Sequence, residues 1–256
     1  MGEVSRYPQG TFCWIDLGTI DVAGARSFYE GLFGWEADDV DGYVLWRLGG
    51  RIVSGLHEHS PEEGTGWTSN VSVDDVDAAA GRARELGAAV VVEPVEIPGI
   101  GKVSSIRDPT GAELALWQPL GHAGAQIVNE VGTWSWNELV AADLQAAATF
   151  YGDLFGWEAD AAPGPIARLG LSMGHLLIGG AHEPTPGEDP RPRWTVSFRV
   201  ADADESADRA EQLGGRIVLP PMDIPMGRIA IVSDPDGATF TLAAVPGGAL
   251  RGVDGS

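Results

Sequence analysis

Apolar and polar residues alternate in short segments, and each segment is followed by a stretch in which apolar residues return at helical spacing. The alternation over residues 11–17, TFCWIDL, predicts a β-strand. Asp21 then suits a helix N-cap, and Gly34 suits the residue that ends the helix. The apolar residues between them that recur at helical spacing are Ala25, Phe28, Tyr29 and Leu32. The segment therefore predicts a strand followed by an amphipathic helix.

A second segment repeats this order. Alternation over residues 68–73 predicts a strand, Asp74 or Asp75 suits a helix N-cap, and Gly87 follows a helix that runs to Leu86. After each predicted helix, short runs rich in Val, Ile, Leu or Trp are separated by turn residues, which is typical of an antiparallel meander. In this segment the runs are residues 90–93, 102–106 and 113–117. Each such module is expected to have the order βαβββ.

The chain is a tandem duplication. FYEGLFGWEAD at residues 28–38 returns as FYGDLFGWEAD at residues 150–160, an offset of 150 − 28 = 122. Residues 66–88 likewise resemble residues 193–215, and Asp-Pro-Thr-Gly from Asp108 matches a later Asp-Pro-Asp-Gly. Two modules in each half give four modules in the chain.

The repeats define the expected domain organisation. One βαβββ module leaves a sheet face uncovered, whereas two paired modules form a curved sheet around a shared cleft. We therefore predict an α+β protein whose four modules pair into two curved, mainly antiparallel sheets. The sequence leaves open whether the modules pair within or between the halves. The expected boundaries are 1–120 for the first domain (modules at about 10–59 and 67–118), 121–131 for a linker, 132–246 for the second domain (modules at about 132–183 and 193–245) and 247–256 for a C-terminal tail.

Charge and composition exclude several classes of function. The formal net charge is −21, and the 16 lysines and arginines form no basic cluster, which disfavours nucleic acid and anionic membranes as partners. Cys13 is the only cysteine, so no intrachain disulfide or thiolate-rich metal site can form. No apolar run approaches the ~20 residues of a membrane helix, and the N-terminus does not resemble a signal peptide. We expect a cytoplasmic monomer or homodimer whose partner is a small organic molecule.

Several of these features together resemble one known family. The paired βαβββ modules, the FYxxLFGW helix end and the closing DPxG hairpin are similar to those of the vicinal oxygen chelate superfamily, which includes glyoxalases, extradiol dioxygenases and bleomycin-resistance proteins. The resemblance covers about residues 10–118 and 132–245. It implies the glyoxalase/bleomycin-resistance fold. It also implies a site on each sheet, where metal-using members carry a His or similar ligand on the first strand of each module and a Glu on the last strand.

This chain departs from the family at those ligand positions. Counted from the helix-capping and DPxG aspartates, they hold Trp14, Thr68, Trp136, Thr195, Ala115 and Thr241. A further position falls near residues 54–55 or 178–180. Indole rings, methyl groups and single hydroxyls do not replace the carboxylate and imidazole ligands of such sites. We therefore expect no chelated metal, no cofactor and no metal-assisted glyoxalase or dioxygenase chemistry.

Strand alternation predicts which residues share a face with the ligand positions. The ligand-binding candidates are Phe12, Trp14, Thr68, Asn70, Glu113 and Trp117 in the first half, and Trp134, Trp136, Thr195, Arg199 and Thr241 in the second. Residues of the opposite parity, expected to pack on the helices, include Cys13, Ile15, Leu17, Val71, Leu114, Leu116, Val196, Phe198, Phe240 and Leu242. Aromatic walls with a few polar groups suit an aromatic or amphipathic molecule. Alternatively, the tryptophans fill the space that a metal occupies in relatives.

Two pairs of equivalent residues are candidates for proton transfer. Asp16 and Glu138 share the predicted face with tryptophans, and a carboxylate against indole rings can have a raised pKa. His57 and His182 end equivalent strands and suit the same role if they overhang the cleft. The alternatives are carboxylates at the rim and ordinary surface histidines. Arg199 could bind an anionic group, but we expect it to pair with Glu138.

These residues support three functions. The first is metal-independent binding of an aromatic or polyketide-like molecule, as in a resistance protein. The second is a metal-free acid–base enzyme of the isomerase, lyase or hydroxylase-like kind, with Asp16, Glu138, His57 or His182 as proton carriers. The third is a structural or interaction protein, if tryptophans fill both clefts.

Overall fold

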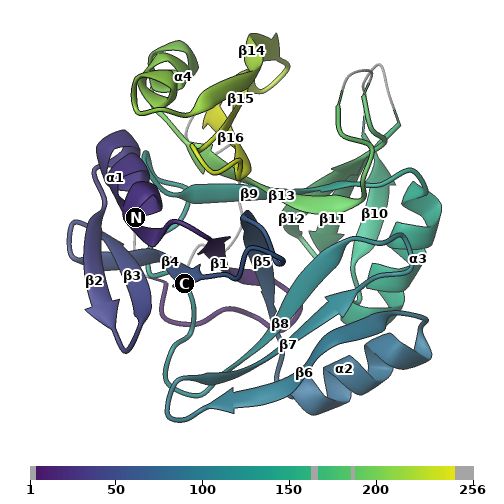
Figure 1. The fold of residues 1–256 in the computed structure, drawn as a ribbon. Coiled ribbons are helices and arrows are strands. Elements are labelled where there is room, and N and C mark those ends of the chain that lie inside the picture. Colours follow the sequence, from purple (N-terminus) through teal and green to yellow (C-terminus); the bar gives the residue numbers. More distant parts are fainter. Residues whose placement is uncertain (1–3, 163–166, 186–187, 246–256) are drawn as a thin grey trace.

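The computed structural model describes residues 4–162, 167–185 and 188–245, so the predicted tail at residues 247–256 lies outside the described residues. The predicted βαβββ order is confirmed and occurs four times (Figure 1). The first half contains β1 (Phe12–Thr19), α1 (Val22–Phe33), β2 (Glu36–Val40), β3 (Tyr43–Leu48), β4 (Arg51–Glu58), β5 (Gly66–Ser72), α2 (Val76–Glu85), β6 (Ala89–Ile97), β7 (Gly101–Arg107) and β8 (Glu113–Pro119). The second half contains β9 (Trp134–Val140), α3 (Leu144–Phe155), β10 (Glu158–Ala161), β11 (Arg168–Met173), β12 (Leu176–His182), β13 (Arg193–Arg199), α4 (Ala203–Gln212), β14 (Arg216–Ile224), β15 (Gly227–Ser233) and β16 (Thr239–Ala244).

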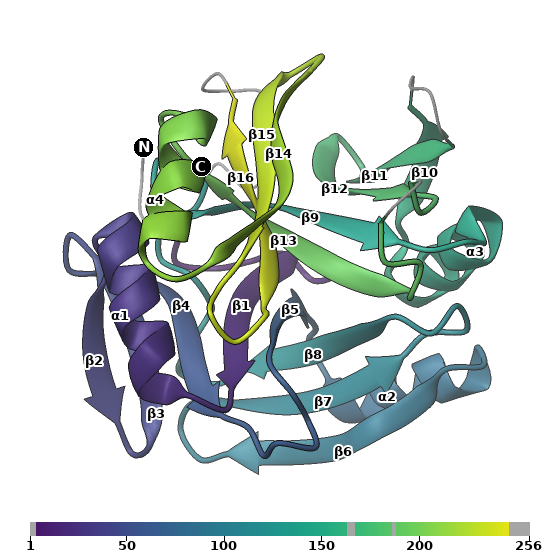
Figure 2. The same ribbon diagram turned by 45° about the horizontal axis from the view of Figure 1, so that its top comes forward.

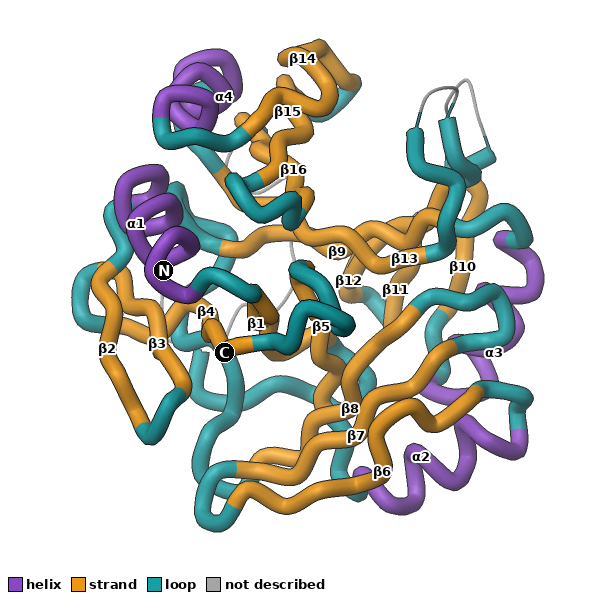
Figure 3. The backbone as a smooth tube through the Cα atoms, in the orientation of Figure 1, coloured by secondary structure: helices purple, strands orange, loops and turns teal. Residues whose placement is uncertain are grey.

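Each half forms one eight-stranded sheet, in which the strands of its two modules run side by side (Figure 3). The strand orders are β2-β3-β4-β1-β5-β8-β7-β6 and β10-β11-β12-β9-β13-β16-β15-β14. The first strands of the two modules pair antiparallel at the centre, and each pairs parallel with the fourth strand of its own module. The modules therefore pair within each half, which the sequence had left open.

Local sequence signals explain the helix boundaries. Aspartate caps all four described helices, and in α1 the side chain of Asp21 accepts the backbone N–H of Gly24. Gly34 and Gly156 end α1 and α3 with φ of 71° and 76°, a left-handed conformation that favours glycine. Within the described residues, no helix is long and apolar enough to cross a membrane.

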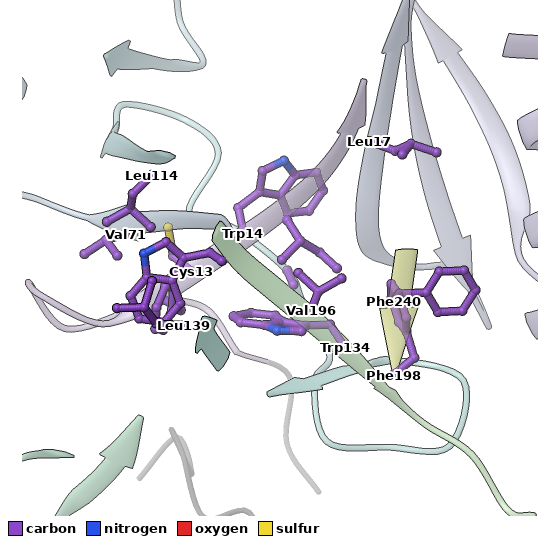
Figure 4. Packing of buried hydrophobic residues seen from close by; sticks show 14 of the residues in the cluster. Cys13, Trp14, Leu17, Val71, Leu114, Trp134, Leu139, Val196, Phe198 and Phe240 are labelled. Atoms are coloured by element: carbon purple, nitrogen blue, oxygen red, sulfur yellow. The ribbon is translucent and has the colours of Figure 1, made fainter. Parts of the chain in front are cut away.

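The helix-facing sides of the two sheets share one core. All the residues predicted to face the helices are buried, and they belong to one apolar cluster that includes residues of both halves. Helix α1 lies beside α4, and α2 beside α3 (Figures 1 and 2). Phe33 of α1 lies 4.9 Å from Phe198 of the second sheet, and Figure 4 shows Phe198 next to Phe240 within this cluster. The core therefore depends on both halves.

Buried hydrogen bonds also join the halves. The hydroxyl of Tyr151 donates to Asp108 Oδ2 at 2.8 Å, and the hydroxyl of Tyr29 donates to Asp234 Oδ2 at 3.1 Å. The two pairs are equivalent in the duplication. Each connects a helix of one half to the DPxG turn of the other half, so the two turns are held from across the interface.

Candidate functional site

The face of each sheet that turns away from the helices, called here the open face, carries most of the predicted site residues. In the first half the strand register places Asp16 beside Gly55 of β4 and Thr68 of β5. Trp14 lies beside Asn70, which in turn lies beside Ala115 of β8. Directly opposed residues in neighbouring strands point to the same side of a sheet. The expected juxtaposition of these residues is therefore present.

Phe12 does not share this face, which corrects the sequence prediction. A β-bulge interrupts the pairing of β1 with β5 between Phe12 and Trp14. Because a bulge inserts an extra residue, strict alternation fails across it. The Phe12 ring instead lies 5.4 Å from Trp157 and 5.1 Å from Trp194, in the contact between the halves.

Trp134, the equivalent residue of the second half, likewise does not share the open face. An equivalent bulge separates its pairing from that of Trp136. Trp134 is buried, and its Nε1 donates to Asn137 Oδ1 at 2.9 Å. Phe12, Trp134 and Trp136 line a cavity of about 40 Å³, which has room for water but not for an aromatic ring.

Four polar side chains meet at the centre of the first open face and form the Asp16 cluster: Asp16, His57, His59 and Asn70. Asp16 Oδ1 accepts a hydrogen bond from Asn70 Nδ2 at 3.1 Å, and its Oδ2 lies 3.5 Å from His57 Nδ1. His57 Nε2 lies 3.0 Å from His59 Nε2, and His59 Nδ1 lies 3.0 Å from the carbonyl oxygen of Gly64. The carboxylate and the two imidazoles thus form a continuous chain.

Tyr43 adds an aromatic group to the cluster. Its ring stacks on His57 with centroids 6.0 Å apart, and its hydroxyl accepts a hydrogen bond from Trp14 Nε1 at 3.3 Å. Gly55 makes this position possible, because a Cβ there would come within 1.9 Å of the Tyr43 hydroxyl. Tyr43 and His59 were not among the residues predicted from the sequence; the glycine opposite Asp16 and the second histidine two positions after His57 are the signals that point to them.

Burial favours the uncharged forms of the groups in this cluster. It raises the pKa of Asp16, and the opposing effects of His57 and the Asn70 hydrogen bond do not cancel it. Burial also lowers the pKa of His57. Burial and the neighbouring Asp16 charge raise the pKa of Tyr43 well above its ordinary value.

The raised pKa of Asp16 predicts a pH-dependent effect of Asp16→Asn on stability. The folded state binds a proton at Asp16 more tightly than the unfolded state, whose carboxyl pKa is about 3.9. This contribution to stability is present at low pH and is lost as pH rises through the folded-state pKa. Urea unfolding at about pH 4, 5.5 and 7 is expected to show the free energy of unfolding of Asp16→Asn rising relative to wild type. A constant difference across this range would contradict a raised pKa of Asp16.

In the second half, ion pairs surround the equivalent residues. His182 Nδ1 lies 3.1 Å from Glu138 Oε1, and His182 Nε2 lies 3.3 Å from Glu188 Oε2. Arg193 pairs with Glu188 at 2.9 Å, and Arg168 lies 3.8 Å from Glu138. Burial acts to lower the pKa of His182, but hydrogen bonding and the charges of the two carboxylates outweigh it and raise that pKa. The two carboxylates therefore favour the protonated form of this imidazole.

Arg199 does not take part in that network. Both Arg199 and Glu138 lie in the described part of the chain, and they do not form the ion pair expected from the sequence. Arg199 Nη1 instead donates to the carbonyl oxygen of Asn129 at 2.7 Å. The partners that Glu138 has instead are Arg168, Trp136 and His182.

The expected linker covers the tryptophans of the first half. Trp14 and Trp117 are only 4% and 6% exposed. The His122 ring lies 4.6 Å from the Trp14 ring, and the His122 carbonyl oxygen accepts a hydrogen bond from Trp117 Nε1 at 2.9 Å. The two indoles are therefore covered rather than forming open walls. His122 was not predicted as a site residue, because it lies in the expected linker.

An aliphatic surface remains exposed farther along the same open face. Val92, Val95 and Ile97 of β6 are 45%, 51% and 41% exposed. Val95 is paired with Val103, and Val103 with Trp117, so this surface lies on the same open face as Trp117. The open face of the first half is consequently polar at the Asp16 cluster and aliphatic at β6.

The other predicted residues lie at less central positions. Glu113 is exposed at the start of β8 and pairs with Arg107. Thr195 donates its hydroxyl to the carbonyl oxygen of Glu138 at 3.1 Å. Thr68 and Thr241 are half-buried on the open faces, opposite Asp16 and Ser197.

The ligand positions of metal-using relatives do not supply a metal site here. Trp14 and Trp136 cannot act as ligands, because the nitrogen lone pair of an indole belongs to the ring's π system, and their Nε1–H groups donate to Tyr43 and Glu138. Ala115 has no donor atom at the last-strand position. Across the described ranges, no group of three or more His, Cys, Asp and Glu side chains is arranged to hold a metal ion. The residues present therefore do not fit the family's metal.

Comparisons with known proteins agree with this architecture. CFP32 of Mycobacterium tuberculosis, whose name assigns it provisionally as a glyoxylase, is 39% identical over 94% of this chain and 97% of its own length. The anthracycline biosynthesis protein DnrV of Streptomyces peucetius is 32% identical over 93% of this chain and 94% of its own. The Mn(II)-bound glyoxalase of Novosphingobium aromaticivorans has the same fold, with a TM-score of 0.65 at 17% identity over 95% of this chain and 86% of that one. A family model matches residues 11–116 and 120–242, and the chain belongs to the Glyoxalase/Bleomycin resistance protein/Dioxygenase superfamily.

Proposed function

We propose that the protein binds a small aromatic or amphipathic organic molecule on the open face of the first half, without a metal ion. The observation that carries this proposal is the division of that face into a polar and an aliphatic part. The Asp16 cluster offers hydrogen-bonding groups, and the exposed side chains of Val92, Val95 and Ile97 offer apolar area. Ligand sites combine apolar contact area with a few placed polar groups in this way.

The relatives support the class of ligand. DnrV is named for anthracycline biosynthesis, and anthracyclines are fused aromatic ring systems with phenol and ketone groups. A flat ring system of this kind would lie on the β6 side chains with its oxygen atoms directed along the open face toward the Asp16 cluster. We further expect the protein to act in the cytoplasm as a monomer or homodimer.

A substitution on the aliphatic surface tests this proposal. Val95→Asp is expected to weaken binding of an anthracycline aglycone about tenfold, since ~1.4 kcal/mol of lost apolar contact and desolvation corresponds to that factor. Quenching of tryptophan fluorescence during titration measures the Kd. Met222→Asp is the matched control, because Met222 is the equivalent residue of β14 and is also exposed.

Two results would contradict the proposal. Equal loss of affinity in Val95→Asp and Met222→Asp would mean that binding is not confined to the first half. Elemental analysis of the same samples is expected to find less than one metal ion per chain, and a stoichiometric metal would overturn metal independence.

A metal-free acid–base activity is the second candidate function, and the chain of Asp16, His57 and His59 is the observation that favours it.

A further inference from the structure

The hydrogen-bond chain from Gly64 to Asp16 restricts where protons can lie. A carbonyl oxygen only accepts hydrogen bonds, so His59 Nδ1 must carry a proton to bond with Gly64. His57 Nε2 and His59 Nε2 are 3.0 Å apart, and one of them must carry a proton for a hydrogen bond to form. His57 Nδ1 is buried and has no hydrogen-bond partner, and Asp16 Oδ2 is the acceptor 3.5 Å away.

A proton count follows from these contacts. If Asp16 were ionised and both histidines neutral, one contact would bring two lone pairs together. A neutral His57 has one ring proton. If that proton is on Nε2, between the imidazoles, His57 Nδ1 presents its lone pair to the carboxylate. If it is on Nδ1, the two Nε2 atoms face each other without a proton. One additional proton removes the conflict, and it can lie on Asp16, His57 or His59. All three placements keep the same heavy-atom positions.

We propose that Asp16, His57 and His59 form a proton-transfer site that retains one mobile proton at neutral pH and whose Asp16 carboxylate exchanges protons with an enolisable or phenolic group of a ligand. Asp16 and His57 are both accessible on the open face, with side chains 18% and 33% exposed, and we assign the ligand-facing role to Asp16 because the chain of contacts ends there. His59 is a positioning residue, since it fixes the hydrogen bonding of His57. The step on the ligand rests on the binding role proposed above, whereas the proton count does not.

The reaction on a ketone ligand is a keto–enol exchange. With the mobile proton on His59, the Asp16 carboxylate removes a proton from the carbon next to the carbonyl group. The electron pair of that C–H bond forms a C=C bond, the π pair of the C=O bond moves to the oxygen, and that oxygen takes a proton from water, which leaves hydroxide. Asp16 then gives its new proton to the hydroxide, and the reverse sequence restores the ketone. The exchange consumes no oxidant or reductant.

The surroundings of the cluster are compatible with this site. The titratable groups that interact electrostatically with it are Tyr43 on β3, Glu63 in the loop after β4 and Cys13, which lies on the helix-facing side of β1. Burial raises the pKa of Cys13 and of Tyr43, so both stay neutral near pH 7. Within the described residues, the structure brings no lysine or arginine into an ion pair with Asp16.

The second half lacks this mobile proton. His182 lies between the carboxylates of Glu138 and Glu188, so both of its ring nitrogens donate and the imidazolium is fixed. Pro184 stands where the first half has His59. The proposal therefore assigns proton transfer to the first half alone.

Nuclear magnetic resonance of the complete protein tests the proton count without any ligand. Samples carrying ¹⁵N-histidine and ¹³C-aspartate report the protonation of His57, His59 and Asp16. At pH 7 we expect either a protonated Asp16 carboxyl or an imidazolium at His57 or His59. An ionised Asp16 beside two neutral imidazoles would overturn the proposal. His59→Gln is expected to lower the pH at which the cluster loses its additional proton. A residue with only a structural role would leave that pH unchanged.

Deuterium exchange tests the transfer itself. The probe is 2-tetralone, an aromatic ketone whose C1 protons are replaced in D₂O, and proton NMR follows their loss. Wild type and Met222→Asp are expected to accelerate exchange at least about tenfold over buffer, and Asp16→Asn to return it to the buffer rate. Exchange at the buffer rate in wild type would overturn the transfer role. The tetralone Kd, measured on the same sample, shows separately whether the proposed binding role holds.

Discussion

Replacing Trp35 by alanine is expected to lower the free energy of unfolding of the whole chain by about 3–5 kcal/mol. Trp35 is 3% exposed, and its ring lies 5.1 Å from Trp46 of its own half and 5.6 Å from Phe198 of the other. Its Nε1 also donates to the carbonyl oxygen of Gly132 at 2.7 Å. The substitution would leave a cavity in the shared core and remove a hydrogen bond between the halves.

Urea unfolding followed by circular dichroism measures this effect. Because both halves contribute to the core, we expect one transition with a lower midpoint rather than separate unfolding of the first half. Trp157→Ala, the equivalent substitution in the second half, is expected to lower the free energy of unfolding by a similar amount. Val95→Ala is the control, since Val95 is exposed and should change stability little. A loss below about 1 kcal/mol for Trp35→Ala would contradict the shared core.

Asp108→Ala is expected to cost about 3 kcal/mol or more, because it leaves several buried donors without an acceptor. Asp108 Oδ1 accepts the backbone N–H groups of Thr110, Gly111 and Ala112 within the DPxG turn. Asp108 Oδ2 accepts the hydroxyl of Tyr151 from the other half. One carboxylate thus closes a turn and anchors it across the interface.

Tyr151→Phe separates these two roles of Asp108. It leaves the backbone hydrogen bonds of the turn in place, but it removes the hydrogen bond between the halves and the acceptor of Trp194 Nε1, so it is expected to lower the free energy of unfolding by about 2 kcal/mol. Urea unfolding of both variants gives the comparison. If Tyr151→Phe destabilised the protein as much as Asp108→Ala, the turn would contribute little and the contact across the interface would carry the effect.

Much of the fold was predictable because its signals are local. Capping aspartates such as Asp21 and left-handed glycines such as Gly34 act within one turn of a helix, and strand alternation acts within a few residues. The face of Phe12 was not predictable, because a β-bulge changes the alternation without a distinct residue pattern. The prediction therefore failed where the backbone departed from its regular period.

The candidate site was predicted only in its central residues. Asp16 and His57 follow from the repeat and from strand alternation. Tyr43 depends on the pairing of β3 with β4, and His122 depends on the path of the segment between the halves. Such contacts join positions far apart in the chain, and no spacing rule encodes them. The ion pair between Arg199 and Glu138 was wrongly predicted for the same reason, because other parts of the chain supply each residue with different partners.

Joining the two halves in one chain has an evolutionary consequence. In a homodimer of identical subunits, every mutation appears at both sites at once. In this chain each half can accumulate its own substitutions while the common core between them is preserved. Gly66 of the first half corresponds to Arg193 of the second, whose guanidinium pairs with Glu188. Duplication within one chain thus permits the second half to carry ion pairs around His182 while the first half carries the Asp16 cluster.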